Sequence, residues 1–376
     1  MLDIISVDTV RQWRAFHRLP YRIYADDPNW VPPLLLERKM HFSARHNPFF
    51  QHAEAKFWVA YRSGIPVGRI SAQIDRLHLD RYNDGTGHFG FIEAVDDPET
   101  FSALLDTAES WLRQAGMVRV LGPVSFSMWD QPGLLVEGFD SPPSVMMGHA
   151  LPYFATRIEA AGYGREQDLL TYEFDVRVPW PPQASRLIER IRNWPGIVIR
   201  NARKSAAAED IAIIHDIIND AWSDNWGFVP MTKAEIDEVG SLIKFLVQDG
   251  DIAIAEYRGR PVAFSAIFPN LNEAIRDLDG RLTPFGWIKL LWRLKVAGLQ
   301  SARMPLMGVR KSFQTSQMGA ALALSVIEAT RAFNEQQGKI LGELSWIHEQ
   351  NHRVRRIIEL VGGVQRKRYR IYAKRL

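Results

Sequence analysis

The sequence predicts an α/β protein with mixed α+β sheets, organised as two consecutive domains of similar fold. Each domain is expected to be a mostly antiparallel twisted sheet flanked by helices. The chain has 376 residues, of which 46% are hydrophobic, enough for two cored domains of ordinary size. A strand, a tight turn and a helix follow one another at 89–114 and again at 303–338. The pattern Ile-Glu-x-x-Gly, with a tyrosine ten residues after the glycine, occurs at 158–172 and at 358–372, which indicates a duplication.

The composition is that of a globular protein without disulfide bonds. There are no cysteines, which excludes disulfides, thiolate metal sites and a cysteine nucleophile. No segment has the charged start and apolar core of a signal peptide, and no run reaches the roughly 18 apolar residues of a transmembrane helix. We therefore expect a cytoplasmic protein.

The first half is expected to begin with a helix and to continue into a sheet. Its predicted elements are, in order, helix 8–25, strands 57–62, 66–74 and 89–94, and helix 101–114. Asp97 is the expected N-cap of the last helix, and Gly116 ends it. The turn before this helix also carries Asp96 and Glu99, so the positive end of the helix already faces negative charge. We interpret this copy of the strand–turn–helix unit as structural.

A proline-rich linker at 178–182 separates the halves. We predict a first domain over 1–177 and a second over 178–376, with an inserted helix at about 284–300. Residues 1–175 carry 16 Lys/Arg and 23 Asp/Glu, whereas the remainder carries 30 and 20. The basic second half therefore suits a polyanionic ligand or an acidic membrane surface.

The second half repeats this order with an insertion. Its predicted elements are helices 209–222 and 232–248, strands 252–257 and 261–268, the inserted helix, strand 303–309, a helix ending near Gly338, and strand 340–347. An aromatic turn between its first two helices contains Trp222, Trp226 and Phe228, which we predict to bind the acceptor substrate. The turn after strand 303–309 reads Gln314-Thr-Ser-Gln-Met-Gly319 and opens a long amphipathic helix. The backbone N–H groups at such a helix start form a ready anion site, although an ordinary capped helix start has the same appearance.

This turn resembles the coenzyme A loop of the GNAT acyltransferase superfamily, whose pattern is Q/R-x-x-G-x-G/A. Gln314 and Gly319 fit the pattern, and Gln317 replaces its first glycine. A glutamine there can offer its N–H only if the turn keeps a helical or bridge conformation. Nearly the whole chain also resembles a widespread bacterial family of tandem GNAT-like proteins. The segments that carry this resemblance are 121–140, 219–231, 269–284 and 342–351.

The resemblance implies two tandem GNAT-like domains, the first degenerate and the second binding acyl-CoA between strands 303–309 and 340–347, with no metal. The family includes bacterial ceramide synthases. It therefore implies direct transfer of a long-chain acyl group, such as palmitoyl, from acyl-CoA to the amine of a sphingoid base, in its 3-oxo form. By the family pattern, the residues expected to bind acyl-CoA are Met307, Val309, Arg310, Lys311, Gln314, Thr315, Ser316, Gln317, Met318, Gly319, Ala320 and Asn351.

Acyl transfer to an amine needs a base, donors for an oxyanion and a proton for the departing thiolate. Strand 303–309 contains no acid, so we predict Glu343, an uncommon carboxylate in a hydrophobic strand, as the base. A Glu343 that merely pairs with a nearby arginine is an equally good interpretation. His348 is the reserve base because imidazole titrates near neutral pH. Family members often have a tyrosine seven residues after Asn351, and here that position is Ile358, which leaves this role unfilled.

The inserted helix has an amphipathic pattern over 285–299. Lys289 and Arg293 share one face, while Trp287 and Trp292 belong to a wide apolar remainder. This pattern suits an interfacial position, so we predict these four residues as membrane contacts. A helix buried between domains fits the pattern equally well. The lipid interpretation leads us to expect a peripheral protein on the acidic inner face of the bacterial inner membrane.

Residues 353–376 hold nine Lys/Arg and one Glu, but no helix-turn-helix or zinc pattern accompanies them, so we expect no nucleic-acid partner. The sequence also has no P-loop, no nucleophile elbow and no cluster with metal-ligand spacing. The expected partners are acyl-CoA, a lipid amine and an acidic membrane surface. Two alternatives remain: a GNAT-fold transferase that uses aminoacyl-tRNA, and a non-catalytic protein that binds a lipid or a partner.

Overall fold

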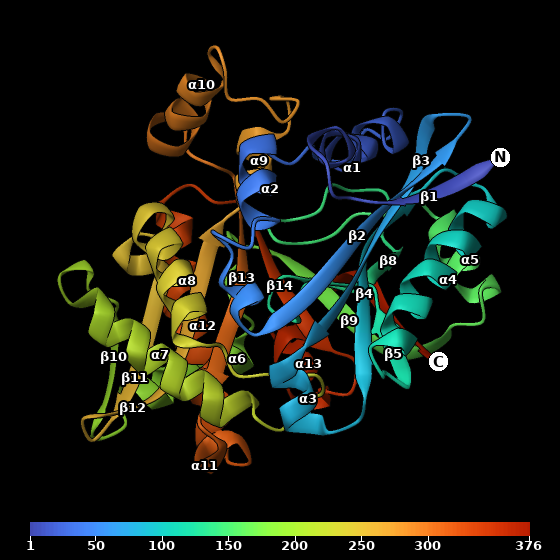
Figure 1. The fold of residues 1–376 in the computed structure, drawn as a ribbon. Helices are drawn as coiled ribbons and strands as arrows, with labels where there is room; N and C mark the ends of the chain where they lie inside the picture. Colours follow the sequence, from blue (N-terminus) through green and yellow to red (C-terminus); the bar gives the residue numbers. More distant parts are fainter. The chain divides into compact units, whose positions relative to one another are not determined.

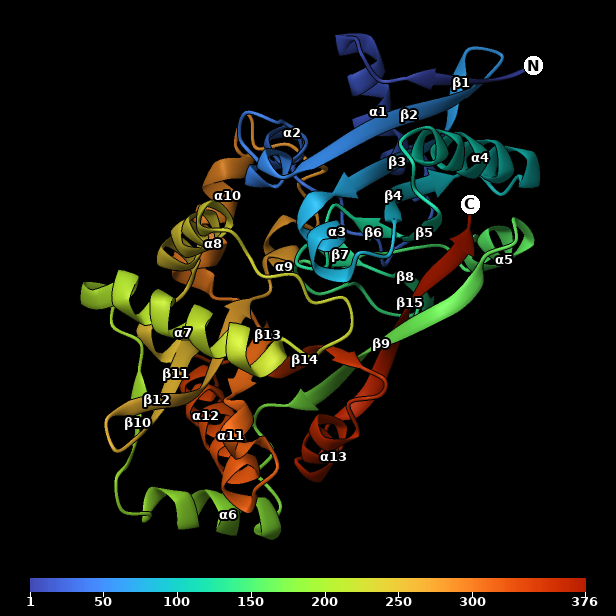
Figure 2. The same ribbon diagram turned by 60° about the horizontal axis from the view of Figure 1, so that its bottom comes forward.

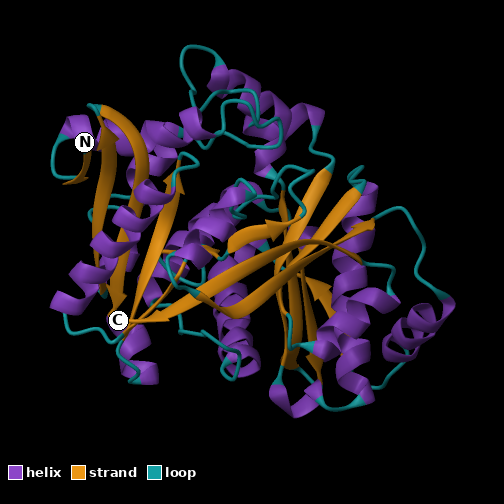
Figure 3. Cartoon of the chain, turned by 90° about the vertical axis from the view of Figure 1, so that its right-hand side faces the viewer, coloured by secondary structure: helices purple, strands orange, loops and turns teal.

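The computed structural model describes the backbone of all 376 residues and the side chains of all but 242–245. Its contacts divide the chain into two compact units. Unit 1 consists of Met1–Leu169, Ile275–Trp287 and Lys367–Leu376, and unit 2 consists of Leu170–Ala274 and Ile288–Arg366. Helices flank the strands in each unit (Figures 1 and 3), which confirms the predicted fold class. The domain boundary near 178–182 stays a prediction.

The sheet of unit 1 has the strand order β1-β2-β3-β4-β5-β15. Its strands are β1 (Leu2–Ser6), β2 (Ala53–Arg62), β3 (Ile65–Asp75), β4 (Thr86–Ala94), β5 (Arg119–Gly122) and the end of β15 (Val364–Arg375). Neighbouring strands are antiparallel, except that β4 and β5 are parallel. The short strands β6 (Val124–Ser125) and β7 (Gln131–Pro132) pair with each other, and β8 (Leu134–Glu137) pairs with β15.

Helices cover both faces of this sheet. They are α1 (Val10–Ile23), α2 (Leu35–His41), α3 (Arg76–Tyr82), α4 (Pro98–Gln114) and α5 (Tyr153–Ala160). On β3, Arg69 donates a hydrogen bond to the carbonyl oxygen of Phe16 in α1. A Cβ at the preceding residue, Gly68, would instead overlap Leu104 of α4. Because successive strand residues point to opposite faces, α1 and α4 lie on opposite sides of the sheet.

Unit 2 repeats this architecture with the strand order β9-β14-β13-β12-β11-β10. Its strands are the end of β9 (Gly164–Asp175), β10 (Ile197–Asn201), β11 (Ile252–Tyr257), β12 (Arg260–Pro269), β13 (Ser301–Val309) and β14 (Leu341–His348). The helices that follow β9 in the chain are α6 (Pro182–Arg192), α7 (Ala207–Trp222), α8 (Lys233–Leu246), α9 (Leu271–Ile275), α10 (Gly286–Trp292), α11 (Lys311–Gln314), α12 (Gln317–Gln336) and α13 (His352–Leu360). The Oγ of Ser265 on β12 donates to the carbonyl of Val326 in α12, whereas a Cβ at Gly308 on β13 would meet Ile217 of α7. Ser265 pairs with Met307, the neighbour of Gly308, so α7 and α12 cover opposite faces.

The two long strands β9 and β15 each begin in one unit and end in the other (Figure 2). The duplicated sequence pattern is therefore exchanged between the units. Tyr172, which ends the first half, donates to Glu359 on α13 at 3.5 Å within unit 2. Tyr372, which ends the second half, donates to Glu159 on α5 at 3.0 Å within unit 1. Each tyrosine thus completes the unit of the opposite copy.

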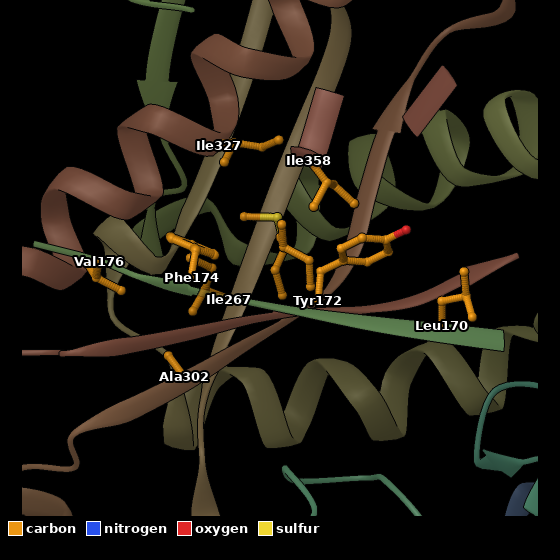
Figure 4. Packing of buried hydrophobic residues seen from close by; sticks show 10 residues of the cluster. Leu170, Tyr172, Phe174, Val176, Ile267, Ala302, Ile327 and Ile358 are labelled. Carbon is orange, nitrogen blue, oxygen red and sulfur yellow. The ribbon is translucent and has the colours of Figure 1, made fainter. Parts of the chain in front are cut away.

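A continuous hydrophobic core surrounds β13, β14 and β9 in unit 2. In Figure 4, the ring of Tyr172 lies next to Ile358, and Phe174 and Val176 follow along β9. Ala302 and Met304 of β13 and Leu344 of β14 belong to this same cluster, whose buried members are Leu170, Tyr172, Phe174, Val176, Ile267, Ala302, Met304, Ile327, Leu344 and Ile358. The core therefore holds in place the paired part of β13 and β14, from which the two strands extend.

The inserted segment is helical, as predicted. It comprises α10 and a single π-helical turn over Arg293–Ala297. Among the helices of the described residues, none combines the length and the apolar character needed to cross a membrane.

Three histidines with lowered pKa values should make the fold sensitive to acid. Burial lowers the pKa of His17 to about 4, of His88 to about 3 and of His348 to about 4. Because the unfolded chain takes up these protons near pH 6.5, their stabilising contribution is complete above about pH 6.5 and is lost as the pH falls toward the folded pKa values. His88→Gln should therefore reduce the fall of the melting temperature between about pH 6.5 and 4, whereas the same change at exposed His352 should not. An unaltered pH slope in His88→Gln would contradict this prediction.

Candidate active site

The central feature of unit 2 is the divergence of its two parallel strands. β13 pairs with β14 from Ser301 and Leu341 up to Met304 and Leu344. Beyond these residues, β13 stays paired with β12 as far as Val309, while β14 extends to His348 without pairing with β13. An opening between the ends of the two strands is what the sequence predicts for the acyl-bearing arm of a donor.

The turn after β13 ends at the N-terminus of a long helix. Ser316 is the N-cap of α12, and its Oγ accepts the N–H of Gly319 at 3.1 Å. Gln317 is the first residue of α12 and therefore has the helical conformation in which a glutamine can replace glycine at this position. A Cβ at Gly319 would overlap the carbonyl oxygen of Phe313, which explains the glycine. The N–H groups of Gln317 and Met318 open the helix, where helical carbonyls cannot accept them.

The basic residues of this turn already have carboxylate partners on α7 and in the turn that follows it. Arg310 pairs with Asp216, and Lys311 Nζ pairs with Asp224 at 2.5 Å. The Lys311 N–H also donates to Asp220 at 2.8 Å. The phosphate groups of a donor would therefore rely first on the N–H groups at the start of α12.

Gln314 ties the same turn to the end of α7. Its Nε2 donates to the carbonyl oxygens of Val309 at 2.8 Å and Ala221 at 3.1 Å. Trp222 Nε1 donates to the carbonyl of Met307 at 3.0 Å. These hydrogen bonds thus involve three residues predicted to bind acyl-CoA (Met307, Val309 and Gln314) and one predicted to bind the acceptor (Trp222). Thr315 caps α11, and Ala320 lies in the first turn of α12.

The predicted acceptor turn reaches the end of β14. The rings of Trp226 and His348 are 6.4 Å apart in an edge-to-face arrangement. Phe228 is buried in the same turn. The structure therefore brings Trp226 together with the reserve base.

His348 combines a buried ring nitrogen with a lowered pKa. Its Nδ1 is buried and has no hydrogen-bond partner among the described residues. Burial lowers the pKa of His348 to about 4, so the imidazole is neutral at pH 7. It lies four residues beyond Leu344, the last residue of β14 that pairs with β13.

Glu343 lies in the paired part of β14, directly opposite Arg303 of β13. Both side chains are buried, and Arg303 is 0% exposed. Glu343 accepts the Ser345 hydroxyl at 2.6 Å, and Ser345 Oγ accepts Arg303 Nε at 2.8 Å. The Arg303 guanidinium also lies over the Trp346 ring, 4.8 Å from its centre. This network indicates a structural role for Glu343 at the point where β13 and β14 diverge. Of the two predicted bases, it therefore favours His348.

Glu343→Gln should lower the melting temperature markedly and change the catalytic rate little. The glutamine can still accept the Ser345 hydroxyl, but Arg303 loses a buried counter-charge, and breaking such a pair costs about 3–5 kcal/mol. Thermal unfolding and steady-state rates measured below the transition separate the two effects. Glu335→Gln is the matched control, because Glu335 pairs with Arg331 at an exposed position. A rate lower by about 100-fold with an unchanged melting temperature would instead support Glu343 as the base.

Two further predicted features of the site are local to α13. Asn351 is the N-cap of this helix, and its Oδ1 accepts the Val354 N–H at 3.3 Å. Ile358 is buried in the core of unit 2 beside Tyr172. The Tyr172 hydroxyl accepts Arg355 Nε at 2.9 Å.

Sequence reasoning did not identify Arg303, Ser345 or the acidic row of α7 as parts of this site. An arginine within an apolar strand was a visible signal for Arg303. Asp216 and Asp220 share one face of α7, and Asp224 follows two residues after its end; their spacing of four residues could have identified the row.

The corresponding divergence in unit 1 is filled by its own chain. The parallel pairing of β4 with β5 ends at His88 and Leu121. Beyond it, the Phe91 N–H donates to Ser125 Oγ at 3.2 Å, and a Cβ at Gly90 would lie 2.5 Å from the Val124 carbonyl oxygen. The start of α4 is capped by Asp97, as predicted. In unit 1, Val124 and Ser125 therefore pack against β4 beyond the end of its pairing with β5.

The predicted membrane residues lie in the inserted segment. Trp287, Lys289 and Trp292 are exposed, and Arg293 Nη1 donates to the carbonyl of Ala274 at 2.8 Å. Within the part of the chain that the structure describes, no three His, Asp or Glu side chains are grouped as a metal site requires.

Comparisons with known proteins agree with this geometry. No protein-family model matches the chain. It is 45% identical to protein YghO of Escherichia coli K12 over 365 residues, which cover 96% of this chain and 93% of YghO. It is 44% identical to the bacterial ceramide synthase of Caulobacter vibrioides over 378 residues, which cover 100% and 98% of the two chains. A tandem GNAT protein from the clavulanic acid biosynthesis pathway has the same fold, with a TM-score of 0.56, 13% identity, and coverage of 100% of this chain and 98% of its own.

Proposed function

This chain belongs to the family of the bacterial ceramide synthase of Caulobacter vibrioides, acyltransferases with the tandem GNAT fold, and on that premise we propose that it N-acylates a sphingoid base. The acyl donor is a long-chain acyl-CoA such as palmitoyl-CoA, and the acceptor is 3-oxosphinganine. The observation that carries the proposal is the divergence of β13 from β14 next to the start of α12.

The donor arrangement follows from these elements. The N–H groups of Gln317 and Met318 hold the pyrophosphate, and Ser316 and Gly319 keep the turn closed. The acyl-bearing arm enters between β13 and β14, where Met307 and Ile347 line the edge of the hydrophobic core. An apolar environment of this kind suits a long acyl chain.

The acyl group is transferred directly from the thioester to the amine, without a covalent enzyme intermediate. His348 Nδ1 takes a proton from the acceptor ammonium, and the free amine attacks the thioester carbon. A backbone N–H at Val309 or its neighbour on β13 stabilises the oxyanion. The C–S bond then breaks, the thiolate leaves with the electron pair, and the His348 imidazolium returns its proton to the sulfur. The products are the amide, the CoA thiol and one proton released to solvent.

The acceptor approaches along the turn that follows α7. Trp226 contacts His348, and Trp222 is bonded to the β13 backbone, so an amine bound there lies between the two. Because both substrates are membrane lipids or lipid-like, the enzyme works as a peripheral protein on the acidic inner face of the inner membrane. The inserted segment, with its exposed tryptophans and its lysine, supplies the contact.

Donor binding tests the proposal separately from chemistry. Isothermal titration with palmitoyl-CoA, acetyl-CoA and unfractionated tRNA should give binding of palmitoyl-CoA that is stronger than that of acetyl-CoA. Binding of tRNA without binding of either thioester would replace acyl-CoA by an aminoacyl-tRNA donor. Binding of neither class would favour a protein without catalytic activity.

A further inference from the structure

The pairing of β13 with β14 ends while both strands continue. The last paired residues are Met304 and Leu344. From residue 305 to residue 309, β13 stays beside β12, and its other edge is unpaired in the part of the chain that the structure describes. We call this part the open edge of β13; α7, β13 and β14 are labelled in Figure 2. Because a free strand edge tends to pair with a neighbouring strand, an edge that stays open next to β14 needs a physical cause.

The backbone groups of Met307 and Val309 face this open edge. The Arg310 N–H donates to the carbonyl of Val262 on β12 at 2.9 Å. The hydrogen-bonding direction alternates from one residue to the next along a strand, so every second residue before Arg310 also faces β12. Met307 and Val309 are the residues between, and their N–H and C=O groups therefore face away from β12.

Side chains already occupy both carbonyl oxygens of the open edge. Trp222 Nε1 donates to the carbonyl of Met307 at 3.0 Å, and Gln314 Nε2 donates to the carbonyl of Val309 at 2.8 Å. Gln314 Nε2 also donates to the carbonyl of Ala221 at 3.1 Å, which ties the edge to the end of α7. A longer parallel ladder with β14 would need the same two carbonyls as acceptors. The two side chains thus take the place that β14 would have as a hydrogen-bond partner.

A carbonyl on β14 is occupied in the same way. Ser345 is the first residue beyond the paired part of β14, and its carbonyl accepts Arg303 Nη2 at 3.3 Å. The N–H groups of Met307 and Val309, in contrast, have no strand partner among the described residues. Backbone N–H groups along a free edge can donate to the carbonyl oxygens of an extended ligand.

We propose that Trp222 and Gln314 are positioning residues for the acyl donor. By occupying the carbonyls of the open edge, they prevent β13 from pairing further with β14, and they leave the N–H groups of Met307 and Val309 to the carbonyl oxygens of the donor arm. This role rests on the proposed function in that an acyl-CoA enters where the strands diverge. It places Trp222 on the donor side, whereas the sequence predicts a contact with the acceptor.

The test removes the indole N–H and then restores a donor at the same position. Trp222→Phe keeps an apolar ring without the N–H, whereas in Trp222→His the imidazole Nε2–H can take the place of the indole Nε1–H. Isothermal titration should show palmitoyl-CoA binding weakened by about tenfold in Trp222→Phe, with most of the loss recovered in Trp222→His. The KM for the acceptor amine should not change in either variant. Trp194→Phe is the matched control in the same unit, because Trp194 is 42% exposed, and it should bind like the wild type.

Hydrogen–deuterium exchange of the ligand-free protein gives a readout that does not depend on activity. In the double variant Trp222→Phe/Gln314→Met, both side-chain donors are absent and the ladder with β14 can extend. Amide exchange over residues 305–309 should therefore be slower than in the wild type.

Two results would overturn the proposal. The first is exchange over residues 305–309 that is unchanged or faster in a folded double variant. The second is a Trp222→Phe variant with a higher KM for the acceptor and an unchanged Kd for palmitoyl-CoA, which would make Trp222 an acceptor contact. If the wild type binds no acyl-CoA, the proposed function fails, while slower exchange in the double variant would still support the part of the two side chains in keeping β13 and β14 apart.

Discussion

His348→Gln is expected to lower kcat by about 100- to 1000-fold, with little change in the KM for acyl-CoA. The buried Nδ1 of His348 has no hydrogen-bond partner in the part of the chain that the structure describes, and its position beyond the divergence of β13 and β14 suits contact with a reacting amine. Glutamine has nearly the same reach but cannot take up a proton. CoA release at saturating acyl-CoA, followed over a range of pH, measures the effect.

The matched control for this variant is His352→Gln. His352 is exposed at the start of α13, four residues along the chain, and its replacement should leave kcat unchanged. The wild-type rate should fall as acid protonates His348 and the acceptor amine, and the histidine component of that pH dependence should be absent in His348→Gln. A variant that retains more than about half of the wild-type kcat would remove His348 from the mechanism.

Gly319→Ala is expected to weaken acyl-CoA binding by about 100-fold, an effect typical of a displacement of about 1 Å in a positioned group. The new Cβ would overlap the Phe313 carbonyl oxygen, so the turn between α11 and α12 must open. The N–H groups of Gln317 and Met318 would then move away from the pyrophosphate. Isothermal titration with palmitoyl-CoA gives the change in Kd.

Gly164→Ala controls for the loss of a glycine as such. Gly164 begins β9, and a Cβ there meets no atom within 4 Å. This variant should bind palmitoyl-CoA like the wild type. If Gly319→Ala also binds normally while its melting temperature is unchanged, the turn is not the phosphate site.

The helix start after β13 could be predicted from the sequence because its determinants are local. The cap by Ser316, the helical start at Gln317 and the requirement for glycine at 319 all lie within a few residues. The partners of Arg310 and Lys311 lie on α7 and directly after it, more than eighty residues earlier, so no local pattern pairs them. The expectation that these two residues face phosphates therefore stays a prediction, with carboxylates as their partners in the structure.

Strand register explains why the role of Glu343 could not be determined from the sequence. Only the parallel pairing of β13 with β14 places Arg303 opposite Glu343, and a shift by one residue would turn that side chain to the other face. The duplicated sequence pattern likewise does not predict how its strands are exchanged between the units. The repeated Tyr172 and Tyr372 mark equivalent strands, but the exchange of these strands between the units depends on tertiary contacts.

The first half illustrates the opposite case. The acidic turn at Asp97 indicated correctly that this helix start is capped by its own side chain. The chain segment at Val124 and Ser125 that fills the strand gap has no recognisable pattern, because its position follows from packing against β4. The cap could therefore be predicted from the sequence and the position of Val124 and Ser125 could not, while the degeneracy of this half stays a prediction.

The central claim is that the protein transfers an acyl group from coenzyme A to a sphingoid amine. Its most direct test is mass spectrometry of the purified protein incubated in detergent micelles with palmitoyl-CoA and an equimolar panel of 3-oxosphinganine, sphinganine and polar amino acids. Free CoA is quantified in the same samples. We predict an N-palmitoyl product of 3-oxosphinganine that matches the released CoA mole for mole and is absent with His348→Gln. Release of CoA without an acylated sphingoid base, or no turnover of palmitoyl-CoA by a protein that is folded and binds it, would contradict the account.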